Sequence, residues 1–146
     1  MSDAFSKIVA ILLCVVMMYI VPVFYMREEA DRFRQTYILE NVTYFVDGVR
    51  NTGILSSDDY DRLKNQLSSV GQIYMIELEH SVYNTDVASD DEYYFVSEHY
   101  TKQVLDELQK NNQYYLSKND YLKLIVKDVD GNVIAWYGGS VKYEAY

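Results

Sequence analysis

The stretch from Ile8 to Met26 reads IVAILLCVVMMYIVPVFYM and contains no charged residue. As an α-helix it would extend about 28 Å, close to the roughly 30 Å of a bilayer's hydrocarbon core. It has no polar stripe, so a soluble protein would have to bury it on every side. Since a chain of 146 residues is too short for that, we predict a membrane anchor with the lipid bilayer as a partner.

The anchor is expected to remain on the mature chain and to cross the membrane once. Lys7 precedes the apolar run, as a basic residue does in a secretory signal. No small-residue cleavage pattern follows the run, so we predict an uncleaved signal anchor. Arg27, Arg32 and Arg34 follow the apolar run, and counting Lys and Arg alone favours a cytoplasmic head. Within the anchor, Pro22 is predicted to bend the helix, and helix packing is expected through Val9, Leu12, Val16 and Tyr19.

The helix is predicted to continue beyond the membrane surface to Arg50. Polar residues from Glu29 to Arg50 recur every three or four positions, and an apolar face lies opposite them. The sequence therefore predicts one helix from near Ala4 to Arg50, whose second half packs against its own head. The residues expected to make this contact are Phe33, Tyr37, Ile38, Val42, Phe45 and Val49.

The remaining residues predict a small α+β head. A short helix is expected to end near Ser69, and alternating polarity predicts a strand from Ile73 to Tyr83. A second helix is expected over 101–110, and Asp130-Gly131 indicates a hairpin between two further strands. Other expectations are a strand over 93–96, a kink at Gly138-Gly139 and a last strand over 141–146. The fold class is thus α+β, a long N-terminal helix packed on a small, mainly antiparallel sheet, with the anchor in 1–26 and the head in 27–146.

Composition narrows the function classes. The formal net charge of -9 argues against binding to nucleic acid. Sixteen tyrosines fit half-buried strand faces, and they also suit a surface that contacts a protein or stacks on a glycan. Cys14 is the only cysteine, so the chain has no intramolecular disulfide.

Signals for chemistry are weak, and we expect no enzyme, no cofactor and no metal. His80 and His99 each follow a glutamate, and together they could hold zinc only if separate elements converged. The alternative is one inward strand histidine and one exposed histidine at a helix start. Asp128 and Asp130 fit a hairpin turn better than a calcium loop. An acidic loop around 84–92 could bind calcium weakly, but a solvated loop is the better explanation.

Two segments carry a resemblance to known families. These are VRNTGILSSDDYDRLKNQLSSVGQIYMIELEH (49–80) and IAWYGGSVKYEAY (134–146). With the long N-terminal helix, they resemble type IV pilins and pseudopilins, and in particular the small Tad-type (TadE-like) membrane proteins of Gram-positive bacteria. The resemblance implies a structural or assembly component of a surface filament. It also implies an extracytoplasmic head, and partners that are pilin-like subunits or pilus-assembly membrane proteins, with a homo-oligomer through the N-terminal helix as a further form.

The chain also departs from the pilin pattern. No glycine precedes Phe5, and no acid lies between Ile8 and Met26, where pilins carry a cleaved leader and a glutamate. An unprocessed, membrane-resident accessory protein fits these residues better than a major subunit. The alternative is a membrane-anchored binding module whose tyrosine-rich acidic head recognises a peptide or a wall glycan.

Overall fold

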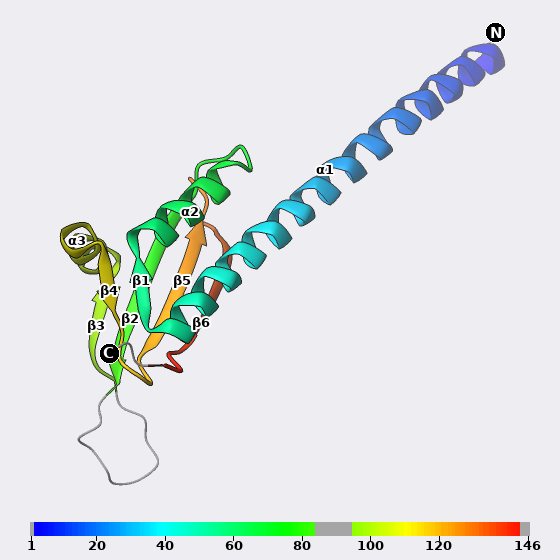
Figure 1. Ribbon diagram of the computed structural model, residues 1–146. Coiled ribbons are helices and arrows are strands. Elements are labelled where there is room, and N and C mark those ends of the chain that lie inside the picture. The colour runs from blue at the N-terminus through cyan, green and yellow to red at the C-terminus, as the bar shows by residue number, and fades with distance from the viewer. Residues whose placement is uncertain (1, 84–94, 144–146) are drawn as a thin grey trace, which may run out of the picture. The chain divides into compact units, whose positions relative to one another are not determined.

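The computed structural model describes residues 2–83 and 95–143 and divides the chain into two compact units, residues 1–36 and 37–146. Helix α1 (Ser2–Thr52) runs from the first unit into the second, as the sequence predicts, and is continuous through Pro22 (Figure 1). It ends at Gly53, which has φ 69° and donates its N–H to the carbonyl of Val49 at 2.7 Å. A left-handed glycine at this position is a common helix stop because it has no Cβ to clash.

After α1 the chain forms β1 (Ile54–Ser56) and α2 (Ser57–Ser68). Ser56 caps α2 by accepting the backbone N–H of Asp59 on its hydroxyl at 3.1 Å, and Asp58 and Asp59 place negative charge in the first turn. Strand β1 pairs with β4 (Gln113–Tyr115) in a two-stranded antiparallel sheet. The sequence analysis missed this sheet, because strands of three residues carry almost no periodic signal.

The main sheet has four strands in the order β3-β2-β5-β6, and every neighbouring pair is antiparallel. The strands are β2 (Met75–Tyr83), β3 (Phe95–Tyr100), β5 (Tyr121–Lys127) and β6 (Val133–Ser140). Helix α3 (Thr101–Asn111) connects β3 to β4. The predicted α+β class and antiparallel sheet are therefore confirmed, as is the turn at Gly131, whose φ is 86°.

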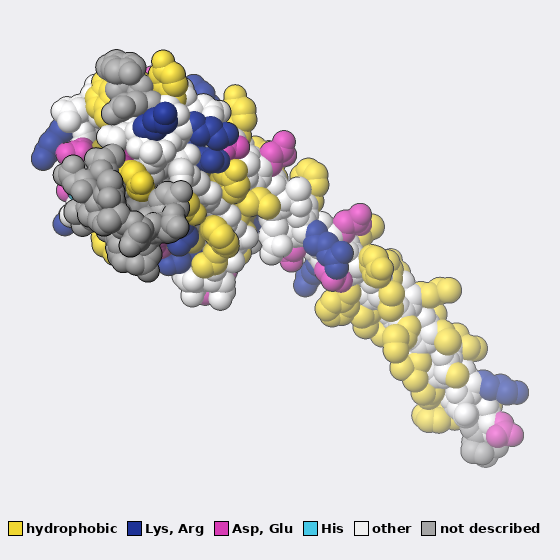
Figure 2. All heavy atoms as spheres, turned by 90° about the horizontal axis from the view of Figure 1, so that it is seen from below, with side chains coloured by type: hydrophobic (Ala, Val, Ile, Leu, Met, Phe, Trp, Pro, Cys, Tyr) yellow, Lys and Arg dark blue, Asp and Glu magenta, His cyan; other side chains and the backbone are white. Residues whose placement is uncertain are grey.

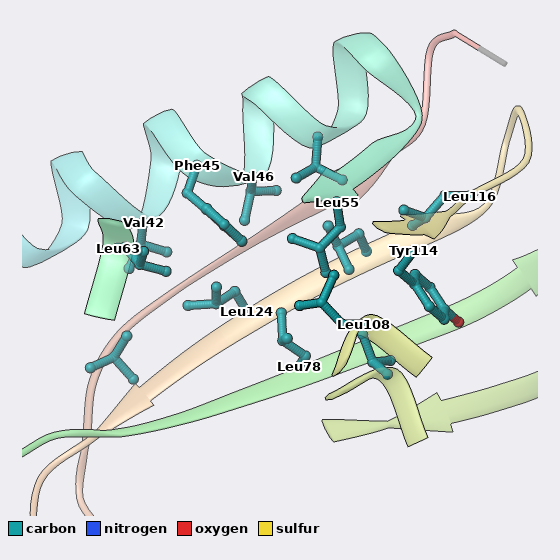
Figure 3. Close-up of a cluster of buried hydrophobic side chains, with 14 of the residues drawn as sticks. Val42, Phe45, Val46, Leu55, Leu63, Leu78, Leu108, Tyr114, Leu116 and Leu124 are labelled. Atoms are coloured by element: carbon teal, nitrogen blue, oxygen red, sulfur yellow. The ribbon is translucent and has the colours of Figure 1, made fainter. Parts of the chain in front are cut away.

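One face of the sheet carries the core of the head. The second unit's part of α1, together with α2 and α3, supplies buried side chains that cluster with those of β2 and β5. Figure 3 shows Val42, Phe45 and Val46 on α1 and Leu78 and Leu124 on the strands within this cluster. The other face bears paired charges, with Glu77 bonded to Lys127 at 2.7 Å and Glu79 to Lys123 at 3.0 Å.

Two expectations near the C-terminus are wrong. Gly138 and Gly139 are regular residues of β6 and form no kink, because β6 stays paired with β5 through both of them. Residues 141–143 form no strand, since the backbone of Val141 bonds to Asn119 and Asp120 in a loop. Residues 144–146 of the expected strand lie outside the described part of the chain, as do the acidic loop at 84–92 and the first residues of the strand expected at 93–96.

Candidate functional site

The apolar part of α1 is the largest exposed hydrophobic surface among the described residues. By length and composition this helix could cross a membrane, and none of its apolar segment is buried. The exposed fraction is 62% for Leu12 and 77% for Tyr19, and Val9, Val16 and Pro22 are also exposed. Figure 2 shows hydrophobic side chains covering this part of the helix. Nothing within the described chain covers the expected packing residues, so lipid or another molecule has to do so.

The residues expected to join the helix to the head divide into two groups. Ile38, Val42, Phe45 and Val49 are buried in the core, and Tyr37 is half-buried. The expectation for Phe33 is wrong, because its side chain is 75% exposed. The sequence analysis also missed Val46, which is fully buried. Val46 lies one turn beyond Val42 on the same face, and that spacing was the available signal.

The last turn of α1 is bonded to β6 through a polar cluster. Arg50 donates from Nε to the carbonyl of Ser140 at 2.9 Å and from Nη1 to Oδ1 of Asp47 at 2.7 Å. The hydroxyl of Tyr137 donates to the same Asp47 oxygen at 3.3 Å. The backbone N–H of Lys142 donates to the carbonyl of Arg50 at 2.8 Å. Three of these four bonds thus join the end of the helix to β6 and to the segment that follows it.

A buried polar group lies at the centre of the head. The Nε2 atom of His80 is 2.9 Å from Oδ2 of Asp120, and its Nδ1 is 2.7 Å from the hydroxyl of Tyr114. All three side chains are buried. Asp120 also accepts the backbone N–H groups of Tyr83 at 2.9 Å and of Ser117 at 2.8 Å. The group therefore joins β2, β4 and the start of β5.

The protonation of this group follows from its donors and acceptors. Burial raises the pKa of Asp120, but hydrogen bonds from His80 and from the backbone of Tyr83 and Ser117 outweigh it, so the pKa of the carboxyl is lowered. Burial raises the pKa of Tyr114 to about 12. An ionised carboxylate only accepts, so Nε2 of His80 donates to Asp120, and Nδ1 shares a hydrogen bond with the Tyr114 hydroxyl. Every polar atom of the group then has a partner.

These contacts leave little freedom for metal binding at His80. The expected inward position of His80 is confirmed. The expectation of an exposed histidine at a helix start is wrong for His99, which lies within β3, is half-buried, and stacks on His80 with ring centroids 5.6 Å apart. Both ring nitrogens of His80 are already bonded, so either would have to give up its partner to hold zinc. Within residues 2–83 and 95–143 no three potential ligands come together. Asp128 accepts three bonds inside its own turn, from Asp130 and Asn132.

The head also has an open groove beside the last turns of α1. It has a volume of about 400 Å³ and lies between α1 and α2, lined by residues that include Tyr44, Gly48, Asp59 and Arg62. Tyr44 is 80% exposed at its edge. The charges at the groove are partly neutralised, since Arg62 lies 3.3 Å from Asp59. The residues that line this groove include no nucleophile paired with a base.

Comparison with known proteins adds no family to these observations. No protein-family model, no curated protein and no solved structure matches the chain.

Proposed function

We propose that this protein is a membrane-anchored structural or assembly component, pilin-like in organisation, of a type IV or Tad-type surface filament. The observation that carries the proposal is the dual use of α1. Its apolar residues between Ile8 and Met26 are uncovered, while Ile38, Val42 and Phe45 of the same helix are buried in the core of the head. A helix that both anchors and completes the head is what a filament subunit or its assembly factor needs.

The chemistry of the head supports a structural role. Its buried polar group is fully bonded and holds strands together, and its charged outer face is internally paired. Neither arrangement leaves a reactive group poised in a cavity. The exposed apolar surface is instead concentrated on the helix, where it can pack against lipid or against neighbouring helices.

The first experiment tests on which side of the membrane the head lies. In a Cys14→Ser background, Lys118→Cys places a thiol on an exposed position of the head, and Ser6→Cys places one before the anchor. A membrane-impermeant maleimide added to intact cells should label Lys118→Cys and leave Ser6→Cys unlabelled until the cells are lysed. The reverse pattern would place the head in the cytoplasm and contradict the filament proposal.

The second experiment tests the partner. A photo-crosslinking amino acid at Leu12, in the anchor, should give discrete adducts with filament or assembly proteins, identified by mass spectrometry. The matched position is Asn65, which is exposed on α2 of the head. Adducts at Leu12 that are only a random sample of membrane proteins would count against the proposal.

A membrane-anchored binding module is the second candidate, favoured by one observation on the outer sheet face. Trp136, the only tryptophan, is 58% exposed, and Nζ of Lys123 lies 5.9 Å from the centre of its ring. An accessible indole beside polar groups is a common platform for glycans and peptides. Saturable change of Trp136 fluorescence on titration with wall glycan fragments or cationic peptides would support this function. An unchanged spectrum would leave the structural role.

A further inference from the structure

Two apolar residues of the first unit lie beyond the expected membrane segment. In the polar stretch from Arg27 to Thr36, Ala30 and Phe33 are the only apolar residues. Both are exposed, Phe33 by 75%. Lipid tails can cover the helix as far as Met26, but Arg27, Glu28 and Glu29 then mark the polar interface. A single exposed aromatic side chain is common on protein surfaces and does not by itself indicate a partner. The informative observation is therefore where Ala30 and Phe33 lie on the helix.

Their spacing continues a heptad pattern from the anchor. The predicted packing residues Val9, Leu12, Val16 and Tyr19 are separated by three, four and three positions. The same alternation runs on through Val23, Met26, Ala30 and Phe33. Because every residue from 8 to 26 is apolar, Ala30 and Phe33 alone select this register. An average period of 3.5 is typical of helices that pair as coiled coils, and in this register the eight residues occupy the a and d positions. We call these eight residues the seam.

The charges beside the seam have a matching arrangement. With Ala30 at a and Phe33 at d, Glu29 occupies a g position and Arg34 an e position. In a parallel, in-register pair, g of one helix faces e of the other five residues later. Glu29 of each copy would then face Arg34 of the other copy, giving two symmetric ion pairs. An antiparallel or staggered pair would not bring these residues together.

Glu29 and Arg34 are available for these intermolecular pairs, because neither makes a strong ion pair within the described part of its own chain. Arg34 lies 3.3 Å from Asp31 on its own helix, in an exposed pair of the kind that contributes little to stability. Glu29 makes no ion pair within residues 2–83 and 95–143. Forming the intermolecular pairs would therefore cost one weak contact in each chain.

We infer that the partner of the seam is a second copy of this chain, whose α1 packs against the first in parallel and in register. This inference rests on the proposed membrane anchorage, which brings two helices into the same orientation. The occupant is a second copy because the charges are complementary to themselves, and the interface is isologous, with the same residues contributed by both copies. The pair extends beyond the bilayer through Ala30 and Phe33.

Disulfide trapping tests the register in the full chain and in its own membrane. In a Cys14→Ser background, Phe33→Cys at d is compared with Gln35→Cys, which lies at f on the opposite side of the helix. Mild oxidation should convert several times more of the Phe33→Cys chain to a dimer, because d positions of an in-register pair bring the two Cβ atoms within disulfide range. Phe33→Cys also removes the aromatic ring, so Ala30→Cys, which retains the ring, is a second trap on the seam and should likewise form several times more dimer than Gln35→Cys.

Charge exchange tests the orientation independently. Glu29→Arg and Arg34→Glu should each lower the yield of the Ala30→Cys dimer severalfold, and co-expression of the two variants should restore it as a heterodimer. Equal trapping at Ala30→Cys and Gln35→Cys, or no rescue by co-expression, would overturn the inference. So would adducts with a different protein at Phe33→Cys. Such adducts would leave the filament proposal standing, whereas a cytoplasmic head would contradict that proposal without affecting self-pairing.

Discussion

The guanidinium of Arg50 occupies the space that a side chain at Gly139 would need. A Cβ built on Gly139 would lie 2.5 Å from Cζ of Arg50 and 2.6 Å from its Nε. The same Nε donates to the carbonyl of Ser140, and Nη1 of the same guanidinium donates to the carboxylate of Asp47. An alanine at position 139 would therefore have to displace the guanidinium that joins the end of α1 to β6.

Gly139→Ala should destabilise the head. The new methyl group would displace the arginine side chain and break its hydrogen bonds, including the charge-assisted bond to Asp47. Loss of such bonds typically costs about 1–3 kcal/mol. Urea unfolding of the full chain in detergent, followed by near-ultraviolet circular dichroism, would measure the change.

Gly48→Ala is the matched control for that substitution. Gly48 lies inside α1, and a Cβ built there meets nothing within 4 Å. Alanine in a helix interior is favoured over glycine by about 0.5–1 kcal/mol. The control should therefore raise the free energy of unfolding by about that amount. Equal destabilisation by both substitutions would show that Arg50 is not the cause.

Asp120→Asn should lower the stability of the head by about 2–4 kcal/mol. The carboxylate accepts bonds from His80, Tyr83 and Ser117, and an amide offers only one acceptor oxygen to these donors. Leaving buried donors unsatisfied costs about 1–3 kcal/mol each. Tyr114→Phe should cost less, about 1–2 kcal/mol, because it removes a single hydrogen bond, the one between the Tyr114 hydroxyl and Nδ1 of His80.

The same carboxylate predicts a pH dependence. The pKa of Asp120 is lower in the folded head than its ordinary value near 4. Its contribution is therefore complete above the unfolded pKa and is lost as the pH falls through the folded pKa. The wild-type chain should lose stability below about pH 4, and Asp120→Asn should lose less over that range. Parallel pH profiles of the two chains would contradict this account of the buried group.

The helices and the hairpin could be predicted from local sequence. The apolar run, the three-and-four spacing after it and the Asp130-Gly131 turn act over a few residues, and each appears in the structure where expected. The prediction for Phe33 is wrong because the three-and-four spacing places this residue on the apolar face of the helix, yet its side chain is 75% exposed. A one-dimensional pattern shows which face is apolar, and it does not show where along the helix the head begins.

The centre of the head could not be predicted in the same way. The partners of His80 are 34 and 40 residues away along the chain. Their meeting depends on the pairing of β2 with β5 and of β1 with β4, which no local signal specifies. The sequence indicated an inward histidine from strand alternation, but nothing in it distinguished Asp120 from the other acids of the chain.

Removal of the second half of α1 should prevent the head from folding. Ile38, Val42, Phe45, Val46 and Val49 all contribute to the core. A chain that begins at Arg27 retains them, whereas a chain that begins at Asn51 lacks all five. Losing several buried aliphatic side chains at about 2–5 kcal/mol each exceeds the total stability of a small domain.

The shorter chain should therefore aggregate or give an amide spectrum without dispersion, while the chain from Arg27 should be soluble and folded. A third chain, from Arg27 with Val46→Ala, is the graded control and should remain folded with a lower unfolding midpoint. If the chain from Asn51 proved as soluble and as cooperative as the chain from Arg27, the helix would be an appendage of the head. The structural role proposed for α1 would then lose its basis.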